Sequence, residues 1–211
     1  QVAVKYADSS IVNFSSGNPY PHTDPALGGA TEQTELNPQG IYGYSILARE
    51  TAFNTSASGN KDQKVTHYRL MYAQHLGYGV LVDLARMVNS GEQISLEMPH
   101  VNLISQRDAI DRALRGFEIA ANPSTLLNVA GPVVPVEDIC AKLGSFLGKE
   151  PVFVGEKADT ALIANDDFCV KSFGPYRDGV DEMLEAAAKW VKDGGEYWNL
   201  PTMFGRADHR Y

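Results

Sequence analysis

Two serine hydroxyls and one tyrosine phenol occupy positions from which they could act together on a small molecule. The β-branched, apolar residues that lead into Ser15 and Ser16 predict a buried strand over 10–16 with hydroxyls at its C-terminal end. Tyr42 lies in the first turn of a helix predicted over 40–57. In an open α/β sheet, ligands bind outside the C-terminal ends of the strands. We therefore expect Ser16 and Tyr42 to converge on one ligand.

The elements that must hold these groups alternate between strands and helices. Besides 10–16, short apolar runs predict strands over 65–72, 93–97, 101–104, 126–129 and 152–154. Besides 40–57, apolar residues at helical spacing predict helices over 80–90, 106–117, 135–147, 165–173 and 179–193, with Ser105 as an N-cap. A stretch rich in proline and glycine predicts a long loop over 19–39. This alternation is typical of an α/β fold with a largely parallel sheet.

Two short motifs resemble those of a known family. Residues 15–21 read SSGNPYP and residues 42–50 read YGYSILARE. These segments resemble, at the right separation, the Ser-Ser-x-x-x-Tyr-Gly and Tyr-Gly-x-Ser-Lys-Leu-x-x-Glu motifs of the extended short-chain dehydrogenases/reductases, which include the NAD-dependent sugar-nucleotide epimerases and dehydratases. The segments 68–72, 102–109 and 127–131 look like later strands and a helix start of the same family.

The resemblance implies a fold of two unequal parts. Residues 1–78 would be the C-terminal part of a Rossmann-like dinucleotide-binding domain with a parallel sheet. Residues 79–211 would form mostly a smaller α/β substrate domain, with some segments returning to the first part. The family begins with a strand and a glycine-rich loop that holds the dinucleotide phosphates, and we find no such pattern here. The chain therefore looks like the C-terminal two-thirds of a longer protein, with the N-terminal strands of the sheet missing.

The resemblance also implies a role for each matched residue. Tyr42 would act as the acid/base, and the Ser16 hydroxyl would hydrogen-bond the reacting oxygen of a sugar nucleotide. Ser15, Tyr42 and Tyr72 would lie beside the cofactor, NAD or NADP. Substrate contacts would come from Ser16, Gly17, Asn18 and Tyr20.

One residue departs seriously from the family pattern. Ile46 stands where the family has a catalytic lysine, and an alkyl side chain cannot stabilise an ionised phenol. Because Tyr42 and Ile46 are four residues apart, we expect them to share a helix face. The alternative is a non-catalytic nucleotide- or metabolite-binding relative, a sensor or scaffold. A further alternative is a fragment that needs a partner chain or dimerises, because a sheet without its first strands exposes an unpaired edge.

Composition and charge argue against several other classes of protein. The net charge of −8 disfavours nucleic-acid and anionic-membrane partners, which need a basic face. No apolar run reaches the roughly 18 residues that predict a membrane-spanning helix. Cys140 and Cys169 fall on apolar helix faces, which favours buried free thiols and a cytoplasmic location. The five histidines have no ligand-like spacing, so we expect no metal site.

Overall fold

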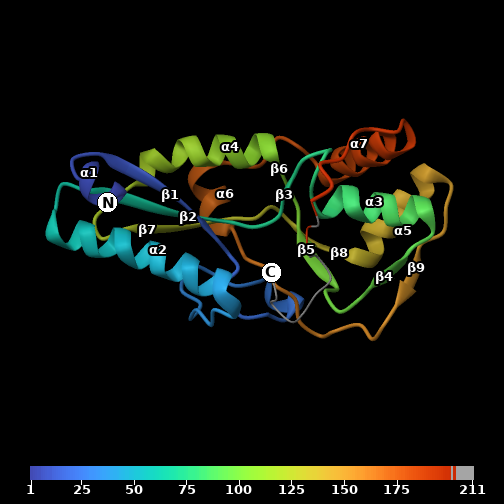
Figure 1. The fold of residues 1–211 in the computed structure, drawn as a ribbon, viewed down its shortest axis with the longest axis horizontal. Helices are drawn as coiled ribbons and strands as arrows, with labels where there is room; N and C mark the ends of the chain where they lie inside the picture. Colours follow the sequence, from blue (N-terminus) through green and yellow to red (C-terminus); the bar gives the residue numbers. More distant parts are fainter. Residues whose placement is uncertain (201, 203–211) are drawn as a thin grey trace.

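The computed structural model describes residues 1–200 and 202, which form two lobes (Figure 1). The first lobe contains a three-stranded sheet flanked by helices, and the second contains three helices and short strands. None of the described helices combines the length and the apolar character needed to span a bilayer.

The sheet of the first lobe is entirely parallel. Its strands are β1 (Ser10–Ser16), β2 (Lys64–Leu70) and β7 (Thr125–Val129), in the order β1-β2-β7. Ser16 pairs with Leu70, so β1 and β2 end together. The helices of this lobe are α1 (Val2–Lys5), α2 (Gly40–Gly59), α4 (Gln106–Arg115) and α6 (Asp167–Phe173). The parallel strands and flanking helices confirm the predicted α/β class.

Alternate side chains of β2 contact helices on opposite faces of the sheet. On one face, Tyr68 Oη donates to the carbonyl of Ala109 in α4 at 2.6 Å. On the other face, Arg69 binds Glu50 in α2. Because side chains of a strand alternate between faces, α2 and α4 cover opposite sides of the sheet (Figure 1). The first turn of α2 therefore reaches the C-terminal ends of the strands.

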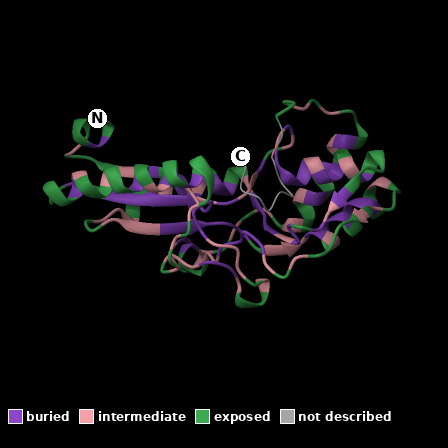
Figure 2. Ribbon diagram, turned by 60° about the horizontal axis from the view of Figure 1, so that its bottom comes forward, coloured by how far each residue is buried: buried purple, intermediate pink, exposed green. Residues whose placement is uncertain are grey.

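The second lobe is built around three amphipathic helices. These are α3 (Val80–Ser90), α5 (Val136–Leu147) and α7 (Val180–Lys192). Their apolar faces form one core, for example through Leu84, Leu143 and Leu184 (Figure 2). Short strand pairs surround this core: β4 (Gln93–Ser95) pairs with β9 (Val152–Val154), and β5 (His100–Asn102) with β8 (Val133–Pro135). The helical spacing of the apolar residues in α3, α5 and α7 is the feature that predicts these three helices from the sequence.

The chain passes between the lobes more than once. The pair β3 (Ala73–Gln74) and β6 (Ile104–Ser105) lies between the end of β2 and the start of α4. After α3 and β5 in the second lobe, the chain returns as α4 and β7 to the first lobe. The short helix α6 also returns to the first lobe, where it packs against β7. The division into a dinucleotide-binding part, 1–78, and a substrate part, 79–211, stays a prediction.

The buried residues of α2 include Gly43, Ile46 and Glu50, whereas Tyr42, in the first turn, is 44% exposed. Tyr42 and Ile46 therefore differ in exposure, and their sharing of a helix face stays a prediction. Glu50 can be buried although it is charged, because it pairs with Arg69 of the sheet.

The two cysteines are buried free thiols, as their apolar helix faces predict. Burial raises the pKa of Cys140 to about 12 and that of Cys169 to about 11. Both thiols are therefore protonated near neutral pH.

Candidate functional site

A cavity of about 590 Å³ lies where β1 and β2 end and the second lobe begins. Five of the predicted site residues line it: Ser15, Ser16, Asn18, Tyr42 and Tyr72. They come from the end of β1, the loop that follows it, the start of α2 and the segment after β2. The fold thus brings together groups that the sequence separates by up to 57 positions, the interval from Ser15 to Tyr72.

Asn18 places a mostly buried side chain at the border of the cavity. Its backbone N–H donates to Ser16 Oγ at 3.1 Å, which fixes the serine at the end of β1. The residue is only 8% exposed, and its Oδ1 accepts no hydrogen bond within the described part of the chain. This oxygen faces α2, since a Cβ built on Gly43 would lie 3.1 Å from it. An unsatisfied buried polar atom of this kind costs about 1–3 kcal/mol.

Gly17 packs against the end of β2, and its backbone N–H donates to the carbonyl of Leu70 at 3.2 Å. A Cβ atom at this position would lie 2.0 Å from Met71 Sδ. A side chain here would therefore require the Met71 side chain to shift. Gly17 does not line the cavity, so its predicted substrate contact stays a prediction.

Tyr20 lies outside the cavity and is almost completely buried. Its Oη donates to Asn128 Oδ1 at 2.8 Å and accepts from Arg69 Nη1 at 2.7 Å. Burial raises the pKa of Tyr20, with Arg69 acting in the opposite direction. These contacts tie the long loop to β2 and β7. The structure gives Tyr20 this anchoring position and does not bring it to the cavity.

An ion pair beneath the cavity fixes the two elements that carry the candidate catalytic groups. Arg69 donates from Nε and Nη2 to the two carboxylate oxygens of Glu50 at 2.9 and 2.7 Å. Ser15 Oγ donates to the same carboxylate. Burial acts to raise the pKa of Glu50, but the bonds from Arg69 and Ser15 outweigh it and lower the pKa. The charged pair therefore clamps α2, which carries Tyr42, onto β1 and β2.

The position of Ile46 is closed off from the cavity. Ile46 is 2% exposed and does not line the cavity. Among the described residues that line it, none is Lys, Arg, Asp or Glu. The titratable side chains there are three tyrosines and His75. The cavity therefore offers hydroxyls, amides and aromatic rings.

Sequence reasoning missed several residues that line this cavity. They are Gln74, His75, Tyr78, Gln106 and Trp198. His75 Nδ1 accepts from the backbone N–H of Gly77 at 3.0 Å, so the neutral ring carries its proton on Nε2. Gln74, His75 and Tyr78 follow a predicted strand closely, and this cluster of amide and aromatic side chains could have marked them as ligand-binding candidates. Trp198 follows the last helix without any periodicity, and no local pattern marked it.

No cluster of three potential metal ligands occurs among His, Cys, Asp and Glu side chains in the part of the chain that the structure describes.

Comparisons with known proteins find similarity in structure alone. No family model matches the chain, and no curated protein matches it significantly in sequence. MoeE5, solved in complex with UDP-glucose and NAD, superposes with a TM-score of 0.72 at 19% identity, over 91% of this chain and 68% of that one. UDP-glucose 4-epimerase from Thermotoga maritima gives 0.71 at 18% identity, over 91% and 66%. dTDP-glucose 4,6-dehydratase from Bacillus anthracis, in complex with NAD, gives 0.73 at 15%, over 91% and 64%.

These likenesses establish the fold. The chain has a partial Rossmann-like α/β fold, as predicted, and shares it with NAD-dependent epimerases and dehydratases of nucleotide sugars. It spans about two thirds of the length of these structures.

Proposed function

We propose that this chain is part of an NAD(P)-dependent oxidoreductase of the epimerase/dehydratase type, within the extended short-chain dehydrogenase/reductase family, acting on a sugar nucleotide or related hydroxyl compound. The observation that carries the proposal is the cavity that unites Ser16, Asn18 and Tyr42 at the C-terminal ends of two parallel strands. This is where α/β sheets bind ligands. The similar structures solved with NAD and UDP-sugars support the same cofactor and substrate class.

In the proposed reaction, NAD(P)⁺ would supply the hydride acceptor for the carbon that bears the substrate hydroxyl. Tyr42 would act as the base that takes the proton of that hydroxyl, so a C–H and an O–H bond would be replaced by a C=O bond. Ser16 Oγ would donate a hydrogen bond to the reacting oxygen. Asn18, which also lines the cavity, would contact a neighbouring hydroxyl of the substrate.

The described residues suit the nicotinamide end of a dinucleotide. Ser15, Tyr42 and Tyr72, which line the cavity, would hold the nicotinamide and its ribose through hydroxyl and ring contacts. The diphosphate requires backbone N–H groups or cations, and the cavity lining in the described chain supplies no cation. The phosphates would therefore have to be held by backbone N–H groups, or by a segment that does not line this cavity.

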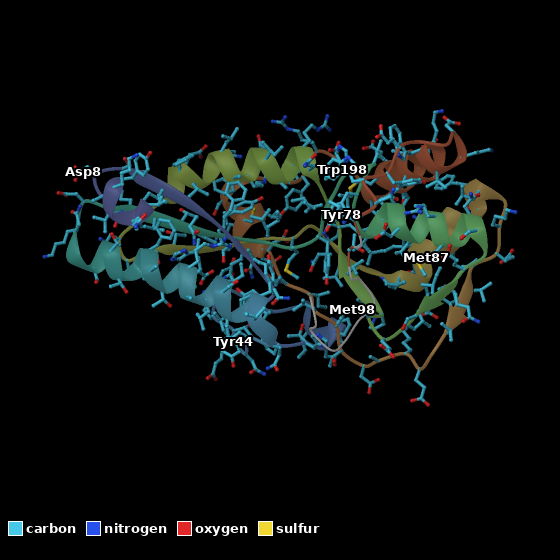
Figure 3. All side chains as sticks on the ribbon, viewed as in Figure 1. Asp8, Tyr44, Tyr78, Met87, Met98 and Trp198 are labelled. Carbon is cyan, nitrogen blue, oxygen red and sulfur yellow. The ribbon has the colours of Figure 1, made fainter. Side chains whose placement is uncertain are left out.

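Turnover of UDP-glucose with NAD tests this proposal. Tyr42→Phe removes the acid/base hydroxyl, and we expect a loss of at least about 100-fold in rate, which is typical of general acid–base catalysis. Tyr44→Phe is the matched control, because Tyr44 is on the same helix, exposed and outside the cavity (Figure 3). Equal rates in the two variants would remove Tyr42 from the mechanism.

A second candidate function is binding of the same ligands without turnover. The buried position of Ile46 and the uncharged lining of the described cavity favour it, because nothing there lowers the free energy of a phenolate. On this hypothesis the protein binds UDP-glucose or NAD and releases no product. Ile46→Lys would then bury an ammonium group and restore no activity. A large gain in rate from Ile46→Lys would contradict the hypothesis.

The free edge of β1 and the surface beside it support a further partner. Phe14 is exposed on β1, α4 exposes Ile110 and Leu114, and the short 3-10 turn that follows α4 exposes Phe117. We infer that a parallel strand with its own helix covers this surface, from a longer version of this chain or from a second copy. Sedimentation of the purified chain, with Leu114→Glu as the comparison, tests the second copy: a dimer that the substitution dissociates supports it, and a monomer in both cases excludes it.

A further inference from the structure

The segment after α7 returns across α3 to the cavity. Thr202 Oγ1 donates to Asp83 Oδ2 at 2.6 Å, and Arg86 lies over the ring of Tyr197 at 4.2 Å from its centroid. Both partners, Asp83 and Arg86, belong to α3. These two contacts hold the segment along the helix, so its position is set by side-chain chemistry and not only by chain connectivity.

Within this segment, Trp198 is seated against the loop between β3 and α3. Its backbone N–H donates to the carbonyl of Gly77 at 3.0 Å. Its ring stacks nearly parallel to that of Tyr78, with centroids 5.9 Å apart, and lies 4.7 Å from the ring of His75 (Figure 3). A side chain at Gly77 would press on the indole, since a Cβ there would lie 3.0 Å from Nε1.

The seated indole still has a large open surface. Trp198 lines the cavity and is 52% exposed despite its contacts with His75 and Tyr78. A large aromatic surface that is held in place and left open is a stacking platform for a ring. The described residues of the cavity carry no Lys, Arg, Asp or Glu, so the part of a ligand that lies there is best matched by an uncharged ring.

We propose that Trp198, supported by Tyr78 and His75, forms the wall of the cavity on which a ring of the bound sugar nucleotide stacks. This proposal rests on the proposed function, because it takes the ligand from that function. The ring is the C–H face of the hexose or the flat face of the base. Both are recognised by the same chemistry, which is contact with an aromatic face.

Tryptophan fluorescence of the full chain tests the proposal without any turnover. The chain has two tryptophans, so Trp190→Phe leaves Trp198 as the reporter and Trp198→Phe leaves Trp190 as the matched control. With UDP-glucose we expect saturable quenching in Trp190→Phe and no change in Trp198→Phe. UMP tests the base alone and glucose 1-phosphate tests the hexose alone. Saturable quenching by either one supports stacking and identifies the ring.

Affinity provides the second measurement. By calorimetry with UDP-glucose, Trp198→Ala should bind about three- to tenfold more weakly, as expected for loss of one ring contact, and Trp198→Phe should recover most of the affinity. Binding of UDP-glucose with no quenching in Trp190→Phe and unchanged affinity in Trp198→Ala would overturn the proposal and leave the proposed function standing. Quenching without turnover would count against the catalytic function alone. Absence of any binding would contradict both.

Discussion

Replacing Arg69 by methionine would leave a buried carboxylate without its counter-charge. In the folded protein, Arg69 and Glu50 side chains are 4% and 5% exposed, and Arg69 forms both bonds of a two-pronged contact. After the substitution, Glu50 would keep only the Ser15 hydroxyl as a described partner. Water cannot replace the lost donors at that depth, so the desolvation penalty of the charge remains.

The expected loss in the free energy of unfolding is about 3–5 kcal/mol, the range for breaking a buried pair by removing one partner. Arg107→Met is the matched control, because Arg107 pairs with Asp178 at the surface and such pairs contribute about 0–1 kcal/mol. Removing both partners, as in Arg69→Met with Glu50→Leu, should lower the free energy of unfolding by less than the sum of the losses in the two single variants.

Urea unfolding of the wild-type chain, Arg69→Met, Glu50→Leu, the double variant and Arg107→Met at neutral pH measures these differences through the midpoint at constant slope. The pH adds a second check. Without Arg69, burial remains the largest influence on Glu50 and acts to raise its pKa against the hydrogen bond from Ser15, so the destabilisation by Arg69→Met should be full above the pKa of Glu50 in the variant and shrink as the pH falls through it. A loss below about 1 kcal/mol, or strictly additive effects of the two substitutions, would refute the account of this pair.

Two further predictions concern the same lobe. His67 is buried between Asn13 and Asn54, and burial lowers its pKa below the usual value near 6.5. The unfolded chain therefore binds this proton more readily, and stability should fall as the pH drops below about 6.5. Thermal unfolding between pH 5 and 7 should show a weaker pH dependence in His67→Gln, and an unchanged dependence would exclude His67 as its source. Gly17→Ala should destabilise by about 1–3 kcal/mol in urea unfolding through its clash with Met71, and Met71→Ala in the same chain should recover part of that loss; no recovery would contradict the steric explanation.

Local chemistry made several elements of the fold predictable. The strand over 10–16 has the predicted bounds because a β-branched run is followed by turn-forming residues. Ser105 caps α4 as expected, with Oγ accepting from the Asp108 N–H at 3.0 Å. The helix predicted to begin at Pro135 begins one residue later, with Pro135 as its N-cap. Such shifts are small because capping and breaking residues act within one turn.

The parts of the site that could not be predicted depend on contacts between distant segments. Nothing near Glu50 shows that its charge is buried, because Arg69 lies on a strand that pairs with it only after folding. The same holds for Tyr20, whose hydroxyl is taken up by Asn128. Trp198 is held at the cavity by a hydrogen bond from its backbone N–H to the carbonyl of Gly77, a residue 121 positions earlier in the chain.

Hydrogen–deuterium exchange of the full chain with UDP-glucose and NAD tests the location of the binding site most directly. The account predicts slower exchange in peptides that cover 16–18 and 72–79, which border the cavity near Ser16 and Tyr72. A second cavity of about 450 Å³, beside β7 at Glu32 and Asp167, is the internal control and should show no change. Protection at the second cavity, or no protection at either place, would contradict the assignment of the site to the ends of β1 and β2.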